Sequence, residues 1–159
     1  MNPNRKALTI IVILALAGFV LAVYDFIAHT QGFPLWCPFA GNGCDIVQNS
    51  RYAVILGIPL SFFGILGFAA YVVLASVAQL SKATVGKLAS EATYFCVYML
   101  LALNIVVLCF LTYFVFLQLT VIHAICSLCM IGVALNLGIG MALVYSLSTR
   151  LPRRLVATA

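Results

Sequence analysis

Four of the six cysteines in this 159-residue chain form two pairs whose spacing allows redox chemistry. Cys126 and Cys129 make a C-x-x-C motif, and Cys37 and Cys44 lie earlier in the chain with six residues between them. A thiolate attacks a disulfide through a mixed disulfide, so two neighbouring pairs can pass electrons to one another. These residues therefore indicate thiol–disulfide exchange.

The C-x-x-C motif opens the last apolar stretch of the chain. At the N-terminus of a helix, unsatisfied N–H groups and the positive end of the helix dipole both favour a thiolate at Cys126. Cys129, nearly one turn deeper, is close enough to form a disulfide but is expected to face the apolar interior. One thiol near water and one near lipid suit electron transfer from a protein to a lipid-soluble acceptor.

Two other uses of the cysteines stay open at this point. The four could form a zinc or copper site, although no ligand-like histidine or carboxylate spacing supports one, and we expect no metal. The pairs could also be purely structural disulfides, although such a bond gains little from placing Cys129 below the interface. Cys96 and Cys109 have no partner at helical spacing on their own stretch, so we expect both to pack as small apolar core residues.

The elements that position these cysteines are apolar segments. Hydrophobic residues make up 65% of the chain and charged residues only 7%, whereas a soluble domain carries about 25% charged residues. A helix needs about 20 residues to cross about 30 Å of hydrocarbon. Four stretches approach or exceed that length, at about residues 8–28, 57–80, 92–119 and 126–147. We predict an all-α integral membrane protein, a four-helix bundle forming one domain over residues 1–159.

The basic residues predict the orientation of the bundle and not nucleic-acid binding. Seven of the eight fall on one side of the predicted spans: Arg5 and Lys6 before the first, Lys82 and Lys87 between the second and third, and Arg150, Arg153 and Arg154 after the fourth. By the positive-inside rule both termini are cytoplasmic. The loop at residues 31–56, the connection at 118–125 and both cysteine pairs then face the periplasm or exterior of an inner or plasma membrane.

The outer loop is expected to have two halves. The glycine, proline and asparagine residues of the first half predict a series of turns. The apolar pattern of the second half, from Asp45 to Leu56, predicts a short helix that lies along the interface. Pro59 is expected in the first turn of the second span, where its missing N–H costs little. We expect Asp25 to be an interface residue, with a tether to the loop as the alternative. We expect His123 to be an interfacial histidine, with thiolate stabilisation or proton delivery as the alternative.

Three segments carry a specific resemblance: GCDIVQNSRYA from Gly43, GIPLSFFG from Gly57 and CSLC from Cys126. In sequence and order they resemble the vitamin K epoxide reductase (VKOR) family, above all its prokaryotic members. The resemblance covers nearly the whole chain, with one cysteine pair before the second span and the C-x-x-C motif at the start of the fourth.

The resemblance implies a division of labour among the cysteines. Members of this kind take electrons from a thioredoxin-fold partner and hand them to a quinone, making disulfides outside the cytoplasm. It implies that Cys44 captures the partner thiolate, that Cys37 relays electrons to Cys126 and that Cys129 reduces the quinone. The quinone would be of the ubiquinone, menaquinone or vitamin K type. Because the sequence ends at Ala159 without a fused thioredoxin-like domain, a separate DsbA-like partner is expected.

The resemblance also implies quinone contacts beyond Cys129. Ser50 matches a family serine on the loop, and Asn136 keeps a family asparagine. Leu60 and Val133 occupy the positions at which animal members present asparagine and tyrosine to the quinone carbonyls, so the sequence departs from the family pattern there. Two alternative functions are vitamin K epoxide reduction in the same fold and a non-enzymatic membrane protein that binds metal through four cysteines.

Overall fold

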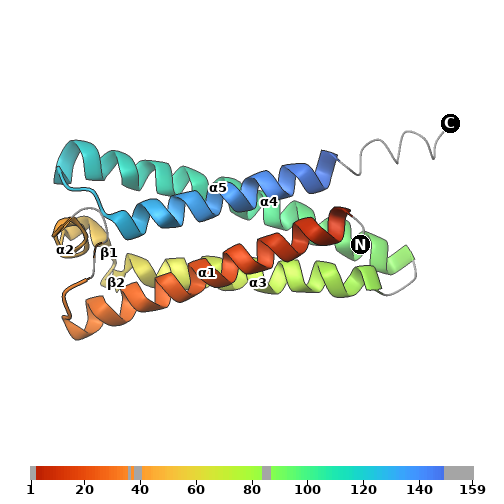
Figure 1. Ribbon diagram of the computed structural model, residues 1–159, viewed down its shortest axis with the longest axis horizontal. Coiled ribbons are helices and arrows are strands. Elements are labelled where there is room, and N and C mark those ends of the chain that lie inside the picture. Colours follow the sequence, from red (N-terminus) through yellow and green to blue (C-terminus); the bar gives the residue numbers. More distant parts are fainter. Residues whose placement is uncertain (1–2, 36, 38–40, 84–86, 149–159) are drawn as a thin grey trace.

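The computed structural model describes residues 3–35, 37, 41–83 and 87–148. Four long helices dominate it (Figure 1): α1 (Pro3–Gln31), α3 (Leu60–Ala83), α4 (Lys87–Leu117) and α5 (Ser127–Ser148). Each is long and apolar enough to cross a membrane. The predicted all-α, multi-pass membrane fold is confirmed.

The four helices form a closed ring. α1 contacts α3 and α5, and α4 contacts the same two helices from the other side. All four lie roughly along the long axis of the molecule, and the chain between α1 and α3 gathers at the end farthest from the N-terminus (Figure 1). Because α5 begins at that same end, the outer loop and the C-x-x-C motif are brought together.

The core near the N-terminal end is an apolar cluster to which every long helix contributes. Its members recur at three- and four-residue intervals, as expected for helix faces that pack on one another. They include Leu8, Ile11 and Ala15 of α1, Tyr71, Ala75 and Ala78 of α3, Cys96 and Leu100 of α4, and Ile139 and Leu143 of α5. Cys96 is thus a core residue, as predicted. Cys109 is exposed on the outer face of α4, so the prediction that it packs in the core was wrong.

A buried polar triad joins three of the helices. Asn104 Nδ2 donates to Asn136 Oδ1 at 3.0 Å and to the hydroxyl of Tyr71 at 3.3 Å, and Asn136 Nδ2 donates to the same hydroxyl at 3.2 Å. In a bilayer such groups would otherwise have no partner, so the triad stabilises the packing of α3, α4 and α5.

Small residues let α1 approach its neighbours closely. A Cβ added at Gly18 would lie 2.2 Å from the ring of Phe68 on α3, and one added at Gly138 of α5 would lie 3.1 Å from Leu14. Glycine leaves room for the close contact at position 18, and at position 138 a larger residue would require Leu14 to shift by a few tenths of an ångström.

The outer loop contains less helix than we expected. Helix α2 spans Gly43–Gln48, followed by one 3-10 turn, η1 (Arg51–Ala53), and a two-stranded antiparallel hairpin, β1 (Val54–Ile55) with β2 (Ile58–Pro59). The prediction of one helix from Asp45 to Leu56 was therefore wrong in its second half. The helix ends because the Ser50 hydroxyl and N–H both donate to the carbonyl of Val47, at 2.6 and 3.2 Å, and so close the chain into a turn.

The hairpin depends on two residues with positive φ at its tip. Leu56 has φ +53° and Gly57 has φ +83°, the left-handed pair that a tight two-residue hairpin requires. Pro59 belongs to β2, and α3 begins only at Leu60. We expected Pro59 in the first turn of that helix, and that was wrong by one position.

The connection between the last two spans is also partly helical. Residues Gln118–Ile122 continue α4 as a π-helical segment, η2. His123 then takes a left-handed conformation, with φ +53°, and ends the helix. A π-helical segment rotates the side chains that follow it, and such segments are frequent at functional sites.

Candidate functional site

Both cysteine pairs lie in one apolar cluster at the end of the bundle where α5 begins. We call it the cysteine cluster; it consists of Ala28, Leu35, Cys44, Val47, Phe114, Leu117 and Cys126. Cys37 and Cys129 pack against it, as do Leu60 and Leu128. Cys44 and Cys126 are both fully buried within it. The sequence predicted that the two pairs would share one end, and the packing brings them into a single cluster.

Cys37 and Cys44 form a disulfide, with their Cα atoms 5.9 Å apart. The flanks of the pair are tied together, because the backbone N–H of Leu35 donates to Asp45 Oδ1 at 2.9 Å. Asp45 also lies in the first turn of α2, where a negative charge complements the helix dipole. As a disulfide, this pair has no thiolates with which to hold a metal.

Cys126 and Cys129 are thiols in this structure. Cys126 directly precedes α5, and its sulfur accepts the backbone N–H of Cys129 at 3.2 Å, as an N-cap side chain does. Hydrogen bonds from the Cys129 side chain and backbone hold the pKa of the Cys126 thiol below its ordinary value of 9.0, against the opposing effect of burial. The thiolate expected from the sequence thus has a specific donor.

Gln118 fixes the backbone on the other side of Cys126. It is fully buried, and its Oε1 accepts the N–H of Cys126 at 2.8 Å. Its Nε2 is buried and makes no hydrogen bond of good geometry with the described residues. The amide nevertheless interacts with the side chain of Cys129. We did not predict a role for Gln118. Its signal in the sequence is a lone amide within an apolar stretch.

Asp25 connects α1 to the outer loop. Gln48 Nε2 of α2 donates to Asp25 Oδ2 at 2.5 Å. Our expectation that Asp25 is only an interface residue was wrong, and the alternative, a tether to the loop, describes it. The carboxylate also acts electrostatically on Cys126 and Cys129, so it lies in the same site.

The other residues expected at the site have different surroundings. Ser50 closes the end of α2, and Leu60 packs against the cysteine cluster at the start of α3. Val133 is half-buried on α5. Asn136 is fully buried, with its amide engaged in the triad with Tyr71 and Asn104. Leu60 therefore packs against the cluster that holds the cysteines.

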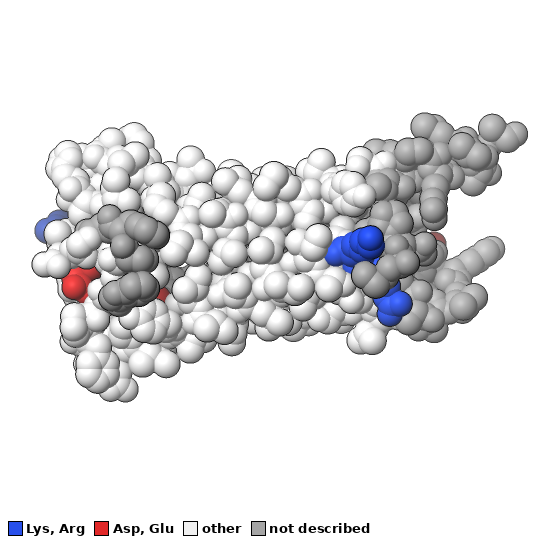
Figure 2. Space-filling view, viewed as in Figure 1, with Lys and Arg blue, Asp and Glu red and all other residues white. Residues whose placement is uncertain are grey.

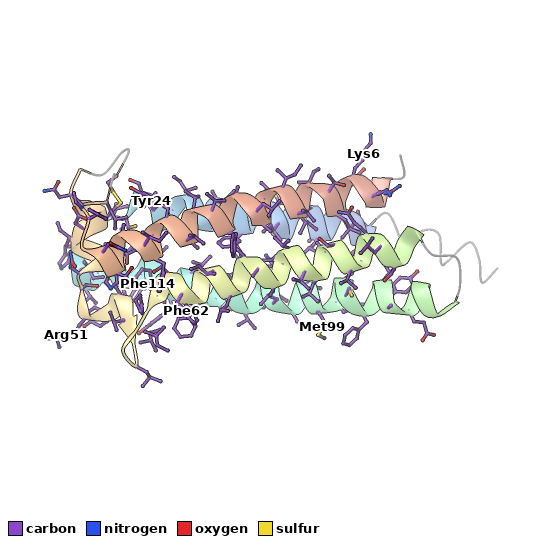
Figure 3. The ribbon with its side chains drawn as sticks, turned by 90° about the horizontal axis from the view of Figure 1, so that it is seen from below. Lys6, Tyr24, Arg51, Phe62, Met99 and Phe114 are labelled. Carbon is purple, nitrogen blue, oxygen red and sulfur yellow. A yellow bond between two sulfur atoms is a disulfide. The ribbon has the colours of Figure 1, made fainter. Side chains whose placement is uncertain are left out.

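Charged residues outside the site lie towards the two ends of the bundle. Lysine and arginine side chains are visible near the N-terminal end and at the opposite end (Figure 2). Figure 3 shows Lys6 at the N-terminal end, and Arg51 at the end where the loop and Phe114 lie. His123, beside the C-x-x-C motif in sequence, is exposed.

A sequence model of the vitamin K epoxide reductase family matches residues 9–144 of the chain. The chain belongs to this family. The match runs from α1 to near the end of α5 and includes both cysteine pairs. This VKOR-family protein is therefore a membrane oxidoreductase with a quinone-linked redox role.

Proposed function

We propose that this VKOR-family protein is a thiol–quinone oxidoreductase that oxidises a separate thioredoxin-fold protein and so supports disulfide formation. The observation that carries the proposal is the packing of the Cys37–Cys44 disulfide in the same cluster as the Cys126 and Cys129 thiols. Exchange requires a thiolate within reach of a disulfide, and the lowered pKa of Cys126 favours that thiolate.

The proposed electron path uses the two pairs in sequence. The partner thiolate attacks Cys44, which releases Cys37 as a thiolate. Cys37 attacks Cys126 of the Cys126–Cys129 disulfide and releases Cys129 as a thiolate. The second cysteine of the partner then attacks the partner–Cys44 bond, which forms the partner disulfide and frees Cys44. Cys44 attacks Cys37, which re-forms the loop disulfide and releases Cys126, and Cys129 is the thiolate that delivers electrons to the quinone. The structure has the loop pair oxidised and the α5 pair reduced, which is the redox state that precedes quinone reduction in this path.

The residues beside Cys129 fit a quinone of the ubiquinone, menaquinone or vitamin K type. Cys129 is half-buried among apolar residues, including Leu60 and Ile122. Nε2 of Gln118 is a buried donor with no hydrogen-bonded acceptor within the part of the chain that the structure describes, and a carbonyl oxygen would satisfy it. It would supply a hydrogen bond that Leu60 and Val133 cannot give. Bound there, a quinone supplies a two-electron, two-proton acceptor.

We propose that the site faces the periplasm or exterior and that the termini are cytoplasmic. Arg5 and Lys6 begin α1, and Lys82 and Lys87 flank the connection between α3 and α4. By the positive-inside rule this end of the bundle is cytoplasmic. The cysteine cluster lies at the other end, where disulfides persist.

The test is a coupled assay in liposomes that contain the full chain and a quinone. A reduced thioredoxin-fold protein is added outside, and its disulfide and the quinol are measured together. The proposal predicts one partner disulfide for each quinol formed. Reduction of vitamin K epoxide to the quinone with dithiothreitol as the electron donor, and no oxidation of the partner by a quinone, would favour the epoxide reductase function instead. A stoichiometric metal ion in anaerobically purified protein, with no quinol, would favour a metal-binding protein.

A further inference from the structure

The half-buried carboxylate of Asp25 acts electrostatically on Cys126 and Cys129, and the electron path does not use it. Asp25 Oδ2 accepts a hydrogen bond from Gln48, but Asp25 Oδ1 is buried with no hydrogen-bond partner among the described residues. Gln48 is itself buried, and its Oε1 is likewise without a partner there. Two acceptor oxygens left unpaired in an apolar site are costly unless something else binds them.

The position of Asp25 connects it to the reacting sulfurs. Ala28, one turn further along α1 and on the same face, belongs to the cysteine cluster together with Cys126. Val47, the neighbour of Gln48 on α2, belongs to it too. The Asp25 charge opposes ionisation of the Cys126 thiol and interacts with Cys129. The Asp25 carboxylate is therefore on the face of α1 that is turned toward Cys126 and Cys129.

A proton on Asp25 would satisfy both unpaired oxygens, Asp25 Oδ1 and Gln48 Oε1. If Asp25 Oδ1 is protonated, it becomes a donor, and Gln48 Oε1 is an acceptor that lacks one. The carboxyl and the amide would then be paired in both directions, with Gln48 Nε2 still donating to Asp25 Oδ2. In the charged form Gln48 Nε2 donates to Asp25 Oδ2, and the neutral form would add a bond from Oδ1 to Gln48 Oε1.

We propose that Asp25 is the proton carrier of the thiol–quinone step, accepting the proton of Cys129 and passing it to an oxygen of the bound acceptor. This inference rests on the proposed function. In the net reaction two electrons leave the two sulfurs, the Cys126–Cys129 bond forms, and the acceptor takes up two electrons and two protons. One proton comes from Cys129 through Asp25. Cys126 releases the other to water, and water returns one to the acceptor.

Three variants separate proton transfer from structural damage. Asp25→Asn keeps an oxygen for Gln48 to bond but cannot carry the proton, whereas Asp25→Glu keeps the carboxyl. Gln48→Leu keeps the carboxyl and its charge but removes the amide that holds it. Glu91→Gln is the control, because Glu91 is an exposed carboxylate near the start of α4, at the end of the bundle opposite the cysteine cluster (Figure 1). All are made in the full chain and reduced with dithiothreitol.

Two readouts are compared: quinol formation with a short-chain ubiquinone, and alkylation of Cys126 by iodoacetamide in quinone-free protein at neutral pH. General acid–base groups contribute about 10²-fold or more, so we expect Asp25→Asn to slow quinol formation by about 10²-fold. Cys126 alkylation should become faster, because an opposing charge is gone. Asp25→Glu should restore much of both, Gln48→Leu should slow quinol formation without faster alkylation, and Glu91→Gln should change neither.

The contrast of a slower enzyme with a more reactive thiol is the signature, since misfolding would not produce it. If Asp25→Asn forms quinol at the same rate as the wild-type protein, the inference is overturned and the proposed function still stands. The inference would also be overturned if Asp25→Asn lost both quinol formation and Cys126 alkylation and Asp25→Glu restored neither. Asp25 would then be a structural tether only. A wild-type protein that forms no quinol would overturn the proposed function together with this inference.

Discussion

The backbone N–H of Cys126 donates to Gln118 Oε1 at 2.8 Å, so the π-helical end of α4 holds the first residue of the C-x-x-C motif. The other side of Cys126 is fixed by the N–H of Cys129, which donates to the Cys126 sulfur. The first contact is buried and the second is partly buried, and together they hold the reactive sulfur in one position before any substrate arrives.

Substitutions of Gln118 should separate the two roles of its amide. Its Oε1 accepts the N–H of Cys126, and its Nε2 is the proposed donor to the quinone. Gln118→Leu leaves the buried N–H of Cys126 unpaired, which should cost about 1–3 kcal/mol of stability. Gln118→Glu keeps the acceptor but loses the Nε2 donor. We expect it to unfold closer to wild type in a thermal melt in detergent, yet to reduce quinone about tenfold more slowly, equivalent to about 1.4 kcal/mol in the barrier. Equal rates for Gln118→Glu and wild type would show that Nε2 does not contribute.

The Cys126 thiol should ionise at a lower pH than an ordinary cysteine. Its pKa lies below 9.0 chiefly because the Cys129 side chain hydrogen-bonds to it. Since the thiolate is the reactive form, the alkylation rate of Cys126, measured by mass spectrometry against pH, should reach its midpoint below that of the unfolded protein. Cys129→Ala removes the side-chain donor and should move the midpoint upward.

The same shift contributes to stability in a defined pH range. The pKa is lower in the folded than in the unfolded chain, so the contribution is fully present above pH 9.0 and is lost as the pH falls through the folded pKa. A midpoint of alkylation equal to that of the unfolded protein would contradict the assignment of Cys126 as the stabilised thiolate.

Partner entry at Cys44 requires the loop to move. Cys44 is fully buried in the disulfide form, whereas Cys37 is half-buried. A thioredoxin-fold partner with only its attacking cysteine should be trapped on Cys44, as found by mass mapping of the adduct. Asp45→Asn weakens the bond that ties the loop at Leu35 and should speed trapping. An adduct on Cys37 would contradict the proposed order. It would mean that the partner attacks the more exposed of the two loop cysteines.

The polar triad should stabilise the bundle without taking part in redox chemistry. Asn104→Leu removes three hydrogen bonds and leaves Tyr71 and Asn136 with fewer partners. Interhelical hydrogen bonds in membranes contribute about 0.6–2 kcal/mol, so its unfolding temperature in detergent should fall. Thr112→Val is the control, because the exposed Thr112 donates to a carbonyl of its own helix. Equal unfolding temperatures for Asn104→Leu and Thr112→Val would show that the triad adds no stability.

The sequence predicted the helices better than the connections. Apolar length alone determines a membrane span, so all four were found with ends displaced by a few residues. The loop could not be predicted in this way, because the end of α2 depends on the Ser50 hydroxyl bonding back to Val47 and the hairpin depends on the conformation of Leu56. These are choices between local hydrogen bonds that hydrophobic periodicity does not report.

The cysteines of the site were evident from spacing, but the polar residues around them were not. Gln118 and Gln48 act through contacts with residues 8 and 23 positions away, and only the folded chain brings these partners together. Cys109 was misjudged because apolar residues pack equally well against lipid and against helices, so composition does not say which face of α4 is inside.

The most direct test of the account is quinol formation by purified protein supplied with a reduced thioredoxin-fold partner and a membrane quinone, followed by absorbance. The wild-type protein should turn over. Cys129→Ala should form no quinol above the uncatalysed rate, while its loop cysteines still exchange with the partner. Quinol formation by Cys129→Ala at the wild-type rate would contradict the proposed electron path, because electrons would then reach the quinone without the second cysteine of the C-x-x-C motif.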